Sequence, residues 1–129
     1  MGAPARPDLA AYDESVRMDA QVLIKELRDL LGARLVAYMA SVKETRAVHE
    51  WAEGERRVRG NDVVNRLRVA YQVARLITVR DEPDVAQAWL QGLNPKLGDR
   101  PPARLLRDGD LEEVGPEVLA AARDFAAVG

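Results

Sequence analysis

The chain has 129 residues, of which 47% are hydrophobic and 31% charged, with 19 basic against 21 acidic side chains and no cysteine. This composition is typical of a folded protein with its own core, and it excludes a disordered chain, disulfides and thiolate metal sites. No apolar run approaches the roughly 18 residues that a membrane span needs, and the first residues lack the apolar stretch of a secretion signal. We therefore expect a cytoplasmic protein that has no contact with a membrane.

The charges are unevenly distributed along the chain. Residues 43–80 carry nine basic and five acidic side chains, whereas residues 81–129 carry five and ten. A basic middle and an acidic end favour two different partners, because each attracts the opposite charge. Ordinary scatter of charges over exposed helix faces would give the same imbalance.

The beginning of the chain predicts an arm followed by a capped helix. Residues 1–18, with two early prolines and Ala-rich patches, favour a mobile arm. Asp19 is a suitable N-cap for a helix that runs to Leu31, and Gly32 is a suitable stop. Leucines recur on one face of this helix at three- and four-residue spacing.

Two short helices are expected next. One covers residues 33–40 and the other residues 44–54. Ser41 and Glu44 have the spacing of a capping box for the second of them.

This pair of helices has the layout of a helix-turn-helix, in which the polar face of the second helix enters the major groove of DNA. Val48 and Trp51 would face the core. The candidates for contacts with base edges or phosphates are Lys43, Arg46, His49, Arg56, Arg57 and Arg59. An ordinary packing of three helices beside an exposed basic loop fits the same spacing.

The remaining chain predicts one long helix and three shorter ones. Asn61 is the expected N-cap of the long helix, along which apolar residues follow helical spacing. Pro83 opens the next helix and Gly92 ends it, residues 101–109 form a short helix, and Pro116 opens the last one.

No segment alternates with the two-residue period of a strand, and strong helix formers dominate. The sequence therefore predicts an all-α fold. We expect a mobile arm in residues 1–18, helix-turn-helix-like helices in residues 19–60, and a small helical binding domain in residues 61–129.

The residues that most catalytic and metal sites require are scarce. His49 is the only histidine, so sites built on a His cluster or a Cys–His or Ser–His pair need residues that the chain lacks or has once. Neighbouring acids such as Glu112 and Glu113 lie near expected helix ends, which indicates caps and solvated turns. The glycines stand singly, not in a phosphate-binding loop. We predict a protein that is not an enzyme and holds no metal or cofactor.

The segment 88–110 contains an ordered series of turn residues and apolar anchors: Trp89, Leu90, Asn94, Pro95, Leu97, Gly98, Pro101, Leu105, Leu106 and Gly109. With this series at its centre, the chain from about residue 60 to 129 resembles the C-terminal toxin-binding domain of Xre/MbcA/ParS-type antitoxins. In that family the same turn residues recur at fixed offsets from the apolar ones.

The resemblance implies an antitoxin of a type II toxin–antitoxin system. Members of the family join an Xre-like helix-turn-helix to the toxin-binding domain, form homodimers, and block a RES-type toxin that degrades NAD⁺. The complex often binds its own promoter, so operator DNA is a second expected partner. The family's C-terminal part lies over the mouth of the toxin's active site. The residues expected to contact the toxin here are Arg104, Arg107, Arg123, Asp124, Phe125, Val128 and Gly129.

A second reading fits the same pattern. The chain would then be a stand-alone helix-turn-helix regulator of transcription, and its C-terminal helices would serve dimerisation alone.

Overall fold

The computed structural model describes residues 6–128 of the chain. These residues form eight α-helices and one short 3₁₀ helix without any β-strand, which confirms the all-α prediction. The elements are α1 (Pro7–Arg17), α2 (Ala20–Leu31), α3 (Ala33–Met39), α4 (Thr45–Ala52), α5 (Asn61–Thr78), α6 (Pro83–Gln91), η1 (Pro95–Leu97), α7 (Pro102–Asp108) and α8 (Leu111–Val128).

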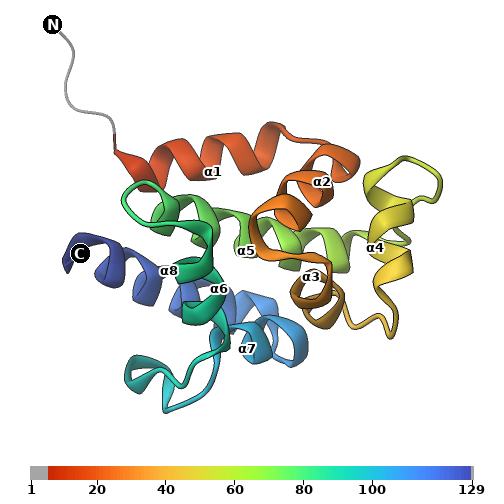
Figure 1. Cartoon of the computed structure of the whole chain (residues 1–129). Coiled ribbons are helices and arrows are strands. Elements are labelled where there is room, and N and C mark those ends of the chain that lie inside the picture. Colours follow the sequence, from red (N-terminus) through yellow and green to blue (C-terminus); the bar gives the residue numbers. More distant parts are fainter. Residues whose placement is uncertain (1–5, 129) are drawn as a thin grey trace, which may run out of the picture.

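Helix α5 runs through the middle of the molecule, and the other helices pack around it (Figure 1). It contacts α1, α2, α3, α6, α7 and α8. Leu67 and Val73 of α5 are fully buried. The core side chains before and after residue 60 belong to one hydrophobic cluster, so both parts of the chain share the same interior.

Several predicted helix ends are confirmed. The side chain of Asp19 accepts a hydrogen bond from the Val22 N–H at 2.9 Å and so caps α2. Gly32, with φ +86°, ends α2. Pro83 is the first residue of α6 and Gly92 follows its last, as their types predict.

The expected arm is instead a helix from Pro7 onward. Helix α1 packs against α5 and buries Ala11 and Ser15, two small residues that give no apolar signal in the sequence. Pro7 starts this helix, a position that tolerates proline because the first N–H groups need no helical partner. Residues 1–5 of the expected arm lie outside the described residues.

The last helix begins before the predicted position. Helix α8 starts at Leu111, and the Asp110 side chain caps it by accepting the Glu112 N–H at 3.1 Å. Pro116 therefore lies inside the helix, where it has no N–H to donate to the carbonyl of Glu112.

Two other predicted caps are wrong. Asn61 is the first residue of α5, and Gly60, at φ +79°, precedes it. Ser41 does not cap α4: its φ of +59° places it in the turn after α3, and α4 begins only at Thr45, with no side-chain cap. A left-handed serine is uncommon and marks a tight turn at this position.

Long polar side chains hold the carboxyl ends of neighbouring helices. Arg66 of α5 donates to the carbonyls of Leu106 and Gly109 at the end of α7, at 2.9 and 2.7 Å. Arg68 of α5 donates to two carbonyls at the end of α1. Further contacts of this kind run from Gln87 to Leu30, from Gln21 to Ala52 and from Arg107 to Tyr38. The last carbonyls of a helix have no partner within it, so these donors satisfy them from outside.

No helix among the described residues combines the length and the apolar character that crossing a bilayer requires.

Candidate functional site

The turn that follows α6 is fixed by its own hydrogen bonds. The Asn94 side chain accepts the Lys96 N–H at 3.0 Å, and the Asn94 carbonyl accepts the N–H groups of Leu97 and Asp99, both at 2.9 Å. Gly98 takes a left-handed conformation with φ +67°, which suits a residue without Cβ. Leu97 is buried and anchors the turn in the core.

The apolar residues of the same series differ in their burial. Leu90, Leu105 and Leu106 are buried, and Pro101 and Gly109 bound α7 on either side.

Trp89 is only half-buried, although its place on the helix stripe predicts a buried ring. Its ring lies beside the exposed Phe125 of α8, with the ring centroids 6.2 Å apart and the planes tilted by 44°. Trp89 therefore belongs partly to the core and partly to the surface.

The last turns of α8 present an apolar surface. Upstream, the helix buries Val118, Ala121 and Ala122, but from Arg123 onward no described residue of it is buried. Val128 is 88% exposed. A groove of about 480 Å³ separates this end of α8 from α6 and the turn after it. Its lining includes Trp89, Leu93, Pro95, Lys96, Asp124, Phe125 and Val128.

An ion pair crosses this groove at its rim. Lys96 Nζ lies 2.8 Å from a carboxylate oxygen of Asp124, and the hydrogen bond from Lys96 lowers the pKa of Asp124 below its ordinary value. Both side chains are more than half exposed, so solvent screens the pair and its contribution to stability is small. Its effect is geometric, because it joins the turn after α6 to the end of α8.

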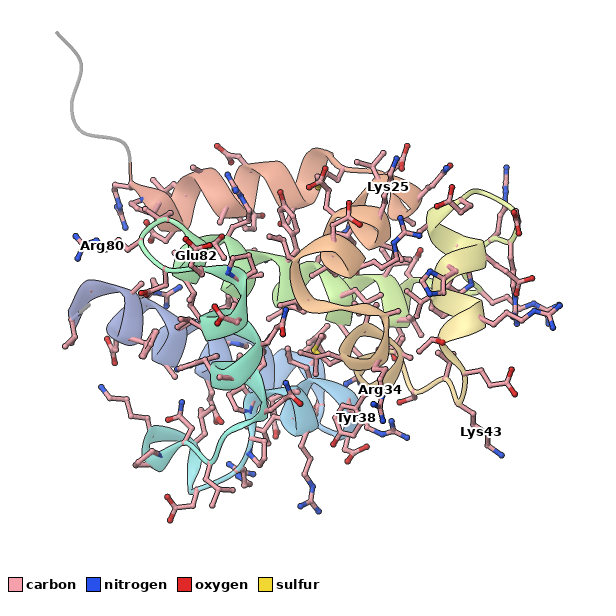
Figure 2. All side chains as sticks on the ribbon, viewed as in Figure 1. Lys25, Arg34, Tyr38, Lys43, Arg80 and Glu82 are labelled. Atoms are coloured by element: carbon pink, nitrogen blue, oxygen red, sulfur yellow. The ribbon has the colours of Figure 1, made fainter. Side chains whose placement is uncertain are left out.

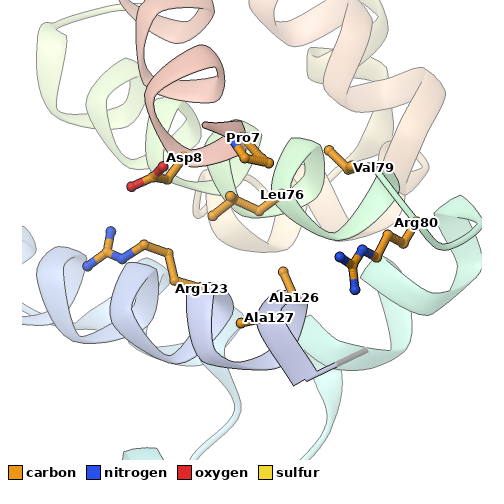
Figure 3. Close-up of a pocket in the computed structure, with 8 residues that line it drawn as sticks. All are labelled: Pro7, Asp8, Leu76, Val79, Arg80, Arg123, Ala126 and Ala127. Carbon is orange, nitrogen blue, oxygen red and sulfur yellow. The ribbon is translucent and has the colours of Figure 1, made fainter. Parts of the chain in front are cut away.

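A second hollow lies on the other side of the same helix end (Figure 3). It has a volume of about 330 Å³ and lies between the start of α1, the end of α5 and the end of α8. Leu76, Val79 and Ala126 provide apolar lining, and Arg80 and Arg123 stand on opposite sides of it (Figure 3). The end of α8 thus has a hollow along each flank.

The structure brings together four of the seven residues that we expected to contact a toxin. Arg123, Asp124, Phe125 and Val128 share the last turns of α8.

The other three lie elsewhere. Arg104 and Arg107 are on α7, which packs against α3, and Arg107 donates a hydrogen bond to the Tyr38 carbonyl at 2.8 Å. Gly129 lies outside the described residues.

The residues expected to contact DNA are close in the chain but differ in their surroundings. Arg46 and Arg56 both lie near Glu50, at 3.8 and 3.7 Å. The ring nitrogen Nδ1 of His49 lies 3.4 Å from Arg28. Carboxylates therefore stand among the cations of α4, and they would oppose an approaching phosphate.

The remaining three of these residues are exposed and have no ion pair within the described part of the chain: Lys43, Arg57 and Arg59. Figure 2 shows Lys43 extending away from the body of the molecule. Val48 and Trp51 are buried, as predicted.

Sequence reasoning missed two residues of the groove beside α8. Leu93 is 74% exposed directly after the end of α6, and an apolar residue in a turn is a signal that could have identified it. Lys96 meets Asp124 across 28 positions of the chain, and no local pattern reports such a pairing.

The described residues contain no cluster of three or more His, Asp or Glu side chains that could hold a metal ion. Comparisons with models of protein families, with curated proteins and with solved structures give no match. The family resemblance seen in the sequence therefore stays a prediction.

Proposed function

We propose that this chain is the antitoxin of a type II toxin–antitoxin system, and that the end of α8 binds and blocks a RES-type, NAD⁺-degrading toxin. It acts by binding and not by catalysis, as a homodimer in the cytoplasm. Binding of the complex to its own promoter is a second role.

The observation that supports toxin binding is the exposed apolar end of α8, held beside a rigid turn. Phe125 and Val128 are large apolar residues open to solvent, and the half-buried Trp89 backs the first of them. Aromatic side chains are enriched at the centres of protein interfaces. The turn that sets their position is the segment that carries the family resemblance.

The geometry suits obstruction of another protein's cleft. The exposed last turns of α8 have a hollow along each flank, so a partner can contact both sides of the helix. Insertion of such an element at the mouth of an active site excludes substrate without any chemistry from the inserted residues. The chain then needs a fixed helix, which packing of α8 against α5 and against the turn at Asn94–Gly98 provides.

The test is relief of growth arrest in cells that co-express this chain and the RES-type reading frame expected next to its gene. The intact chain should restore growth and the cellular NAD⁺ level. The double variant Phe125→Glu/Val128→Glu should lose this protection, because two carboxylates would have to be buried in the interface without partners.

Val22→Glu is the matched control. Val22 is likewise an exposed apolar residue, but it lies in the first turn of α2, where a glutamate suits the helix dipole. This variant should protect as well as the intact chain. Full protection by the α8 double variant would contradict the placement of the toxin-binding surface. Failure of the intact chain to protect would contradict the proposal that its partner is a RES-type toxin.

Promoter binding is supported by the exposed, unpaired cations Lys43, Arg57 and Arg59 at the end of the molecule that α4 occupies. The same observation fits a stand-alone regulator of transcription. The two functions differ in the role of the α8 end. A stand-alone regulator would not relieve the growth arrest caused by a toxin, with either the native residues or glutamates at positions 125 and 128.

A further inference from the structure

A third groove lies between α3 and α7, away from the end of α8. It has a volume of about 610 Å³. Helices α3 and α7 pack against each other, and the carboxyl end of α8 lies toward the other end of the molecule (Figure 1). The groove has apolar and cationic lining from Leu31, Arg34, Leu35, Tyr38, Ala103 and Arg104.

The charged lining of this groove is entirely positive. Arg34 and Arg104 are exposed, and neither has an ion pair or side-chain hydrogen bond within the described residues. The groove beside α4 contains Glu44 and Glu50, and the hollow between α1 and α8 contains Asp8, so cations there have carboxylates nearby. Two unpaired guanidinium groups that face one groove favour an anionic occupant.

Tyr38 forms a fixed aromatic wall of the groove. The Arg107 guanidinium lies 4.8 Å from the centre of the Tyr38 ring and also donates to the Tyr38 carbonyl. Tyr38 is nevertheless 39% exposed, and Figure 2 shows it close to Arg34 on the same side of the molecule. Tyrosine and arginine together are the residue types enriched where proteins bind each other most tightly.

We infer that the groove between α3 and α7 binds an acidic segment of a partner protein, one that carries an apolar side chain between carboxylates. The carboxylates would pair with Arg34 and Arg104, since guanidinium and carboxylate groups match in a two-bond geometry. The apolar side chain would lie against the exposed side chain of Tyr38. A DNA backbone satisfies the arginines but offers no apolar group to the Tyr38 wall, which is why a protein segment fits better.

This inference does not rest on the toxin assignment, because it concerns a surface separate from the end of α8. The test uses the full-length ¹⁵N-labelled chain and a synthetic peptide of about ten residues in which pairs of Glu alternate with Leu. The amide signals of residues 31–38 and 103–107 should shift on titration, whereas those of residues 123–128 should stay in place. Binding should weaken as salt rises.

The double variant Arg34→Ala/Arg104→Ala should bind the peptide about tenfold more weakly or worse, since two charge-assisted contacts are lost. Lys25→Ala/Arg80→Ala removes two cations that are also exposed and lie outside this groove, and it should bind like the intact chain. Unchanged thermal unfolding of both variants will show that each is folded.

Three outcomes would overturn the inference: no shifts at millimolar peptide, equal weakening in both double variants, or shifts spread over the whole surface. A random-sequence DNA duplex serves as the alternative probe. Shifts of the same amides by the duplex, with none by the peptide, would make the groove a phosphate-binding surface and would also overturn the proposal.

Discussion

Gly109 shows how one residue can fix the junction of two helices. It follows α7 with φ −80°, a value that any residue adopts, so its backbone does not require glycine. Space does. A Cβ at this position would lie 2.6 Å from Cγ1 of Val114 and 2.8 Å from the Leu105 carbonyl oxygen. The close approach of α7 and α8 therefore depends on the missing side chain.

We expect Gly109→Ala to lower the free energy of unfolding by about 1–3 kcal/mol, the usual cost of overpacking, because either Val114 or the backbone must move. Gly92→Ala is the matched control. Gly92 ends α6 with almost the same dihedral angles, but a Cβ there would meet only the Ala88 carbonyl, at 3.2 Å. Urea denaturation of both variants measures the difference; equal stabilities would contradict the crowding at Gly109.

At this scale the sequence predicts residue roles well where they follow from local chemistry. Asp19 as a cap, Pro83 as a first residue and Gly109 as a stop were all expected from residue type. The reason for Gly109 could not be predicted, because the contact with Val114 depends on how two helices pack. Half-burial of Trp89 depends likewise on Phe125, which is distant in the chain.

Among the elements, α5 has a special part because it holds the ends of two other helices. Arg66 is largely buried, with 16% of its side chain exposed, and binds two carbonyls of the α7 end as well as Asp62. These carbonyls have no other partner inside their helix. The arginine thus replaces the water that would otherwise solvate the helix end.

Arg66→Ala should lower the free energy of unfolding by about 2–3 kcal/mol, because hydrogen bonds to a charged donor are lost and the carbonyls stay partly buried. Arg66→Lys should recover only part of this, since one ammonium cannot reproduce the fork of a guanidinium. Arg59→Ala, at an exposed and unpaired position, should change stability by less than about 0.5 kcal/mol. A loss at Arg66 no larger than at Arg59 would show that the α7 end is adequately solvated by water.

The helices that were predicted with the correct bounds begin and end at residues with strong preferences for helix ends, such as Asp19 and Gly32 for α2 and Pro83 and Gly92 for α6. Helix α1 was missed because its buried residues, where the structure describes their side chains, are the small Ala11 and Ser15, which form no apolar stripe in the sequence. The start of α8 was misplaced because Pro116, a residue common at helix starts, lies a turn and a half after the real cap at Asp110. For α1, packing against α5 outweighed the local preference; for α8, the Asp110 cap outweighed the preference of proline for a helix start.

Over the whole molecule, the basic middle of the chain is less available than its composition suggests. Arg66 and Arg68 are used inside the fold, and Arg46 and Arg56 share the carboxylate of Glu50. The cations that could meet a phosphate are therefore few. Composition could not reveal this, because it does not distinguish an arginine that caps a helix from one that faces solvent.

Binding to the chain's own promoter fragment tests the DNA role. If Arg57 and Arg59 each contact a phosphate, the variant Arg57→Ala/Arg59→Ala should reduce the slope of log affinity against log salt by about 1.8, near 0.9 for each lost contact. Arg80→Ala/Arg123→Ala, which removes two arginines at the other end of the molecule, should leave the slope unchanged. Fluorescence anisotropy over a salt series measures both slopes. An unchanged slope for the first variant would show that the DNA-binding surface lies elsewhere than near α4.

The arginine contacts also determine what a partner of the α3–α7 groove would meet. Arg107 fixes the end of α3, and Arg66 fixes the end of α7, so both walls are held before any partner arrives. Apart from the side chains of Arg34 and Arg104, which a partner would immobilise, little conformational entropy of this protein remains to be lost on association. The ordering cost of binding would then fall mainly on the partner's segment, and a partner segment that is already rigid would gain most in affinity.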